Sequence, residues 1–316
     1  SLERLEDAVT LLERLGSAHE KSTAVAYWFG RAKELVGDRT TARESYKRAI
    51  ELDEDGRELV ESYVGLTRLL AQDGLAEEAA KEIAKALERF PERPEVYVAV
   101  GDLATTQGKY EEGIGHYDKA LALDGGDIGT HFRRGVALRR ARSFEEAQRE
   151  FEGVAEIDPD YPGLALEWGL LFEASGRSEE ALASYESALG KAPDDPDLML
   201  RVGCGKAKAG QTDTAVELLK KVLSQRPNSA ETNHCLGRAL LFGDNDVREA
   251  MRYLDRAVML DGNRAEHHLY VGWAANEARD PAKAERALTR ALELDQTLAE
   301  AYWQRGVLRN RQGAVK

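Results

Sequence analysis

Glycine recurs through this chain at a fixed interval. Gly101, Gly135, Gly169, Gly203 and Gly237 are each 34 residues apart, and the series continues at Gly30, Gly272 and Gly306. A second column, of alanine, keeps the same frame: Ala8, Ala42, Ala79, Ala147, Ala181, Ala215, Ala250 and Ala284. A unit copied along the whole chain predicts a solenoid, in which each unit buries its apolar face against its neighbours.

The interval slips in two places. Three extra residues fall between Ala42 and Thr67, and one falls between Gly237 and Ala250. The polar residues 53–57 and the stretch 243–245 supply turn-forming side chains in these two intervals. We therefore expect both insertions to be loops between helices.

Each unit has the pattern of two short amphipathic helices. In residues 162–195, apolar side chains at helical spacing precede Ser175 and Gly176, and a second such set follows Glu179 and Glu180. Prolines stand after the second set in several units, as expected of a residue that cannot continue a helix: Pro159, Pro193 and Pro227. The pattern predicts an all-α fold.

Several positions of the unit resemble the tetratricopeptide repeat (TPR) family. They are the small glycine of the first helix, the small alanine of the second (Gly113 in one copy), the terminal proline, and a large residue four positions after that small residue, as in Tyr46, Tyr117, Phe151 and Tyr185. The resemblance implies a right-handed superhelical α-solenoid of antiparallel helix pairs. It covers residues 1–316 as one domain, with a half-repeat at 1–22, eight full repeats over 23–298 and a half-repeat at 299–316. The incomplete first and last repeats suggest a fragment of a longer protein.

Composition narrows the classes of function. The net charge of −13 argues against a nucleic-acid partner, because nucleic-acid binders show a basic footprint. No stretch approaches the roughly 20 apolar residues of a membrane span, so membrane insertion is not predicted and a cytoplasmic location is favoured. The excess of arginine over lysine is typical of a GC-rich bacterial genome.

The resemblance implies that the first helices line a concave groove that holds a partner. Projected onto this sequence, the central groove combines apolar and basic side chains: Phe132, Arg133, Val136, Arg139, Arg140, Leu166, Leu170, Leu200, Arg201, Lys208 and Arg238. Such a surface suits a protein or peptide ligand with apolar anchors and acidic residues. Alternatively, neighbouring side chains fill the floor and the arginines pair with nearby glutamates. A rival location is the aromatic end formed by Tyr270, Trp273 and Trp303.

Enzymatic signals are weak. The six histidines form no spaced metal motif and no recognisable nucleophile arrangement, so we predict no catalytic residue, no metal and no cofactor. Cys204 and Cys235 lie on the first helices of adjacent repeats beside His234, and two free thiols are the expected outcome.

Two kinds of function fit these observations. The first is a non-catalytic scaffold that presents its groove to a partner segment. The second is a regulatory or assembly arm of a larger bacterial protein, in motility, secretion or signalling machinery, whose active domain lies elsewhere. RNA binding by helical hairpins is disfavoured by the acidic balance, and the sequence leaves the oligomeric state open.

Overall fold

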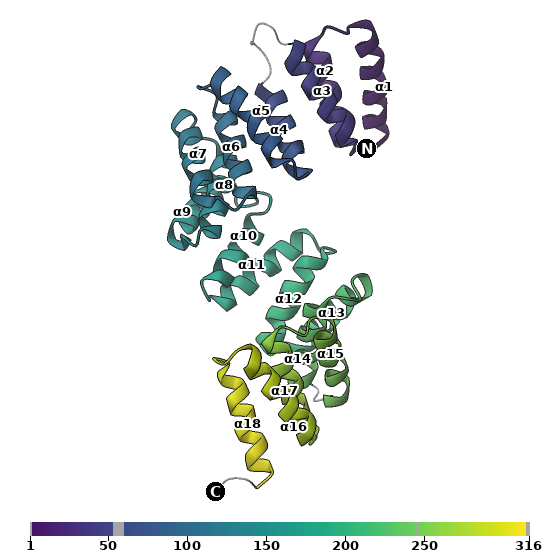
Figure 1. Ribbon diagram of the computed structural model, residues 1–316, viewed down its shortest axis with the longest axis vertical. Coiled ribbons are helices and arrows are strands. Elements are labelled where there is room, and N and C mark those ends of the chain that lie inside the picture. Colours follow the sequence, from purple (N-terminus) through teal and green to yellow (C-terminus); the bar gives the residue numbers. More distant parts are fainter. Residues whose placement is uncertain (1, 53–59, 244–245, 314–316) are drawn as a thin grey trace. The chain divides into compact units, whose positions relative to one another are not determined.

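The computed structural model describes residues 2–52, 60–243 and 246–313, and every regular element within these ranges is an α-helix (Figure 1). The helices are α1 (Leu2–Ala18), α2 (Thr23–Leu35), α3 (Arg39–Leu52), α4 (Val60–Gln72), α5 (Ala76–Arg89), α6 (Pro94–Thr106), α7 (Tyr110–Leu123), α8 (Ile128–Arg140), α9 (Phe144–Ile157), α10 (Leu164–Ala174), α11 (Ser178–Lys191), α12 (Pro196–Lys208), α13 (Thr212–Gln225), α14 (Ala230–Phe242), α15 (Val247–Leu260), α16 (Ala265–Glu277), α17 (Pro281–Leu294) and α18 (Ala299–Arg311).

The helices follow the predicted repeats. Each predicted full repeat contains one pair, from α2 and α3 in the first to α16 and α17 in the last. α1 and α18 occupy the half-repeats at 1–22 and 299–316. The prediction of an all-α solenoid of helix pairs is therefore confirmed. The predicted loop at 53–57 and the loop residues Asp244 and Asn245 lie outside the described residues.

Local sequence explains where the first helices begin. Ser22, Asp127, Asp195 and Ser229 each accept a hydrogen bond from a backbone N–H of the first turn of the helix that follows. Such caps satisfy backbone donors that have no partner within the helix. α10 begins later in its repeat than the other first helices, at Leu164, directly after Gly163 with φ of 86°.

The glycine and alanine columns are points of close helix packing. A Cβ atom added to Gly101 would lie 2.6 Å from Cε1 of Tyr117, on the second helix of the same repeat. Ala147 of α9 is fully buried, as are its counterparts Ala42, Ala79, Ala215, Ala250 and Ala284. Small side chains let the two helices of a pair approach, and the large ring or leucine of the second helix fills the space beside the contact.

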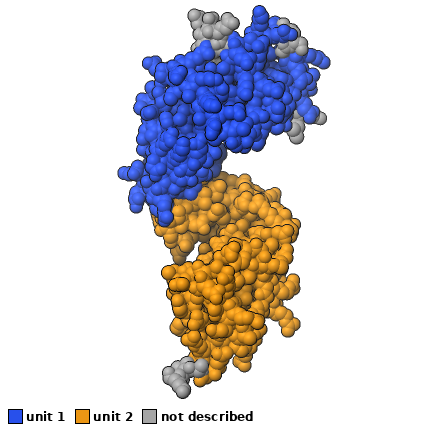
Figure 2. All heavy atoms as spheres, viewed as in Figure 1, with its two compact units in different colours: residues 1–164 blue, residues 165–316 orange. Residues whose placement is uncertain are grey.

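The chain divides into two compact units, residues 1–164 and 165–316 (Figure 2). In the first, a core cluster extends from Ala42 to Leu103 and joins successive repeats through Tyr46 and Leu66. In the second, a core cluster extends from Ala207 to Ala287 around Leu236 and Leu254. First helices of neighbouring repeats contact each other within the units, as α4 contacts α6 and α12 contacts α14. None of the described helices is long and apolar enough to cross a membrane.

Candidate partner-binding site

The predicted groove residues are distributed over both units. α8 of the first unit carries Phe132, Arg133, Val136, Arg139 and Arg140. The Phe132 ring is half-buried, with its centroid 4.9 Å from that of Tyr161 and 6.0 Å from that of Phe151. Much of this ring therefore serves packing within the first unit, while Arg140 is exposed.

The apolar floor predicted for the second unit is also partly used by packing. Leu166 and Leu170 of α10 contact the core around Ala181 and Tyr185. Leu200 of α12 packs against the core cluster around Leu236. All three leucines are half-buried, so the floor presents only part of its apolar surface to a ligand.

Two of the groove arginines belong to a recurring contact that the sequence analysis did not identify. Tyr185 of α11 donates its hydroxyl to Oε2 of Glu173 at 2.6 Å, and Arg201 of the next repeat donates to the same oxygen at 2.9 Å. The same triad joins Tyr46, Glu34 and Arg68, and also Tyr117, Asp102 and Arg133. Burial raises the pKa of all three tyrosines, which therefore stay neutral donors. Arg133 and Arg201 thus link neighbouring repeats.

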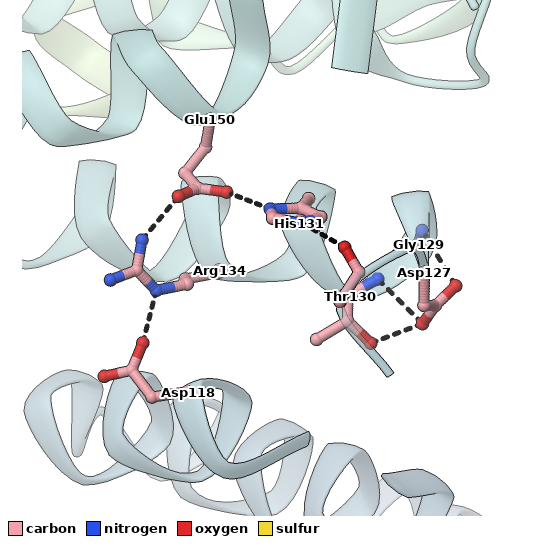
Figure 3. Close-up of polar contacts among 8 residues, drawn as sticks. Asp118, Asp127, Gly129, Thr130, His131, Arg134 and Glu150 are labelled. Carbon is pink, nitrogen blue, oxygen red and sulfur yellow. Dashed lines mark hydrogen bonds and ion pairs between the residues drawn. The ribbon is translucent and has the colours of Figure 1, made fainter. Parts of the chain in front are cut away.

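A second polar network lies beside α8 in the first unit (Figure 3). The Arg134 guanidinium lies between Asp118 of α7, at 2.7 Å, and the Glu150 carboxylate of α9. His131 Nδ1 is 2.7 Å from the other Glu150 oxygen, and its Nε2 is 3.2 Å from the carbonyl oxygen of Gly125. Every member contacts another, which marks this network as structural support for the helix pair.

One cavity of the second unit is lined by the second helix α11 and by the first helices α12 and α14. It has a volume of about 450 Å³ and brings together three predicted site residues, Arg201, Lys208 and Arg238. Its other lining residues come mostly from α11, α12 and α14: Glu173, Ser178, Glu179, Ala181, Leu182, Tyr185, Cys204, Gly205, Ala209, Glu231, His234, Cys235, Arg264 and Glu266. A cavity of this size can receive one side chain of a partner or a small ligand.

The cations of the cavity differ in their pairing. Arg201 is held by Glu173, and Arg264 lies 3.6 Å from the Glu266 carboxylate. Lys208 and Arg238 have no carboxylate partner among the residues that the structure describes. Arg238 lies instead over the Tyr270 ring, 5.3 Å from its centroid. These two cations are therefore the ones available to a ligand.

His234 lines the cavity, and only 9% of its surface is exposed. Its ring centroid is 4.9 Å from that of His267 and 5.0 Å from that of Tyr270, and its buried Nδ1 has no hydrogen-bond partner. Burial, reinforced by nearby cations, lowers the pKa of His234 to about 3, so the ring is neutral.

The structure corrects the expectation of two free thiols. Cys204 of α12 and Cys235 of α14 form a disulfide, with Cα atoms 5.2 Å apart, inside the usual range for such bonds. Both residues line the cavity. They are 31 residues apart, one helical turn short of the 34-residue repeat, and this spacing is the sequence signal that could have indicated their contact.

The aromatic end is only partly a cluster. The rings of Tyr270 and Trp273 stack with centroids 5.9 Å apart, and Phe242 meets Trp273 edge-on at 4.8 Å. Trp303 lies on α18, 70% exposed and outside this group of rings. Tyr270 also contacts His234 and Arg238, so the aromatic group adjoins the cavity.

Within the described ranges, no group of three or more histidine, cysteine, aspartate or glutamate side chains is arranged to hold a metal ion. The side chains around the cavity are suited to hydrogen bonding and ion pairing, and its unpaired cations favour an anionic group.

The fold is an α-solenoid of helical hairpins. Three family models described as tetratricopeptide repeat match the chain, at residues 64–128 and 132–196, at 206–271 and at 24–55. Together they match most of its length. The chain belongs to the tetratricopeptide repeat family, whose members typically serve as protein-interaction scaffolds.

Solved structures show the same fold at low sequence identity. The Cut9–Hcn1 hetero-tetramer of the APC/C aligns with a TM-score of 0.62 at 16% identity, covering 95% of this chain and 58% of that one. YrrB, described as a TPR protein with an unusual peptide-binding site, aligns over 58% of this chain and 95% of its own, with a TM-score of 0.50 and 22% identity. The human IFIT1 dimer with m7Gppp-AAAA aligns over 98% of this chain and 78% of its own, with a TM-score of 0.50 and 19% identity. No curated protein matches the chain.

Proposed function

We propose that this chain is a non-catalytic scaffold that binds a segment of a partner protein along the first helices of its second unit. The observation that carries the proposal is the cavity on α12 and α14, with Lys208 and Arg238 unpaired and a group of aromatic rings beside it. A ligand segment with an acidic side chain and an apolar anchor matches both features.

A protein ligand fits this surface better than a nucleic acid. The net charge of −13 repels a polyanion, whereas binding to a phosphate backbone needs basic side chains that neutralise it. Arg201 and Arg264, two further basic residues of the cavity, already contact carboxylates. The ligand class proposed here is also the one named for YrrB, whose likeness to this chain supports the fold alone.

The first unit offers a second predicted location on α8. Arg140 is exposed there, whereas Arg133 pairs with Asp102 and Phe132 packs against neighbouring rings. The part of the predicted groove formed by Phe132, Arg133, Val136, Arg139 and Arg140 stays a prediction, and a single set of variants can compare it with the second unit.

Selection of a peptide ligand tests the proposal. A random twelve-residue peptide library is displayed against the immobilised chain, and the affinity of each selected peptide is measured by calorimetry. We expect Arg238→Glu to weaken binding by about tenfold or more, because a fully engaged charge is reversed. Arg140→Glu reports on the first unit, and Lys221→Glu on the exposed face of α13 serves as the matched control.

Two results would oppose the proposal. One is the failure of the library to yield any specific peptide. The other is a set of selected peptides that bind the Arg238→Glu and Lys221→Glu variants equally well. A loss confined to Arg140→Glu would move the binding site to the first unit.

A further inference from the structure

We infer that the cavity on α12 and α14 is a subsite for an acidic side chain of the ligand, and that the Cys204–Cys235 disulfide gates it. The inference rests on the proposed function, because it specifies which ligand group binds at one point of that interface and which bond regulates its binding. It concerns the second unit only.

The cations stand one helical turn beyond the disulfide. Lys208 follows Cys204 by four residues on α12, and Arg238 follows Cys235 by three on α14. Residues at these spacings share one helix face, so the disulfide and both cations lie along the same side of the two helices. The disulfide thereby sets the distance between the helices that carry the two charges.

Two buried polar atoms at the cavity have no partner in the protein. They are Nδ1 of His234 and Nε of Arg238. A buried polar group without a hydrogen bond is destabilising, so a ligand oxygen that reached either atom would remove part of that penalty. With its Nδ1 protonated, the neutral His234 ring can donate to a carboxylate.

Four carboxylates and four arginine or lysine side chains line the cavity, so its attraction for an anion is local to the cations that have no carboxylate partner. Glu173 and Glu266 are engaged by Arg201 and Arg264, and Glu179 and Glu231 lie in the first turns of α11 and α14. Arg238, Arg264 and Lys208 all act on His234 as positive charges. A carboxylate entering beside His234 would therefore be attracted by its surroundings.

Reduction of the disulfide changes the geometry of the subsite. A dithiol reductant transfers two electrons and two protons: the Cys204–Cys235 S–S bond breaks, two cysteine thiols form, and the reductant closes its own disulfide. α12 and α14 then lose their covalent link. The spacing between Lys208 and Arg238 is then no longer fixed by a covalent bond.

Fluorescence polarisation with a labelled hexaglutamate peptide tests the subsite directly. We expect the oxidised chain to bind this probe and to bind labelled hexaglutamine much more weakly. Lys208→Gln and Arg238→Gln should each reduce the affinity for hexaglutamate by about tenfold, because each removes one charge of the site. Lys220→Gln on α13 is the matched control and should bind as the wild type does.

The gate is tested with dithiothreitol and with the Cys204→Ser/Cys235→Ser variant. Reduction should weaken hexaglutamate binding severalfold while far-ultraviolet circular dichroism keeps its helical signal. The double variant should bind more weakly than the oxidised wild type and should not respond to dithiothreitol. Unchanged affinity in both cases, or a loss of helicity on reduction, would refute the gate, since the bond would then serve another purpose.

The failure of this inference differs from the failure of the proposed function. If a peptide from the library binds the second unit but ignores Lys208→Gln, Arg238→Gln and dithiothreitol, the subsite is wrong and the scaffold stands. If no peptide binds, the proposed function fails with it. Equal binding of hexaglutamate and hexaglutamine would show that the cavity has no preference for an acidic side chain. This inference would then be wrong, while the proposed scaffold function would stand.

Discussion

At Gly135, an added Cβ atom would lie 2.6 Å from Cε1 of Phe151, closer than real Cβ contacts allow. Gly153, in the second helix of the same pair, has no neighbouring atom within 4 Å of the corresponding position. We expect Gly135→Ala to destabilise the protein by about 1–3 kcal/mol through overpacking. Gly153→Ala should stabilise it by up to about 1 kcal/mol, because glycine inside a helix is entropically unfavourable. Denaturant midpoints measure both, and shifts of the same sign would contradict the packing argument.

Arg142 and Arg279 adopt backbone angles that suit glycine. Their φ angles are 68° and 56°, and they occupy the turn between paired helices where Gly108 and Gly176 stand in other repeats. An L-residue in this left-handed region is strained, whereas glycine is not. Arg142→Gly should raise the free energy of unfolding by about 0.5–1 kcal/mol.

The reverse substitution checks this conclusion about the turn. Gly108→Ala places a side chain at φ of 78°, so it should lower the thermal midpoint. If Arg142→Gly lowers the midpoint as well, contacts of the arginine outweigh the backbone strain.

At the scale of elements, α7, α8 and α9 are tied by the network around Glu150 (Figure 3). The Glu150 side chain is 14% exposed and receives both Arg134 and His131. Glu150→Ala leaves these two donors without their shared acceptor, and we expect a loss of about 1–3 kcal/mol of stability. Glu152→Ala, on the exposed face of the same helix, is the control and should change little. A thermal melt of each variant decides between them, and equal shifts would assign the network no special role.

At the scale of the whole molecule, the stability of a repeat array is a sum of repeats and of the interfaces between neighbours. The prediction that residues 1–316 form one solenoid domain can be tested at Gly169, where a Cβ atom would clash with Tyr185. If the array is continuous, Gly169→Ala should speed amide hydrogen exchange in α8 and α9 as well as in α10 to α13. An increase confined to residues 165–316 would show that the two units behave as independent domains.

Much of the fold could be predicted because its determinants are local. The 34-residue period, the columns through Gly135 and Ala147, and prolines such as Pro159 located the helix pairs before any tertiary contact was known. Each helix pair packs mainly within itself and against its neighbours, so spacing along the chain translates directly into position in the stack.

The candidate site could be predicted only in outline. The period placed Arg201, Lys208 and Arg238 on first helices, but their pairing depends on the offset between adjacent helices and on long side chains with many rotamers. Only the tertiary structure showed that Glu173 engages Arg201 while Lys208 and Arg238 remain unpaired. The disulfide between Cys204 and Cys235 depends on the same offset. If the two helices were shifted by one turn, the cysteines would not meet and both thiols would be free. Sequence thus determined the repeat and its packing, and the crossing of neighbouring helices decided which polar side chains a ligand can reach.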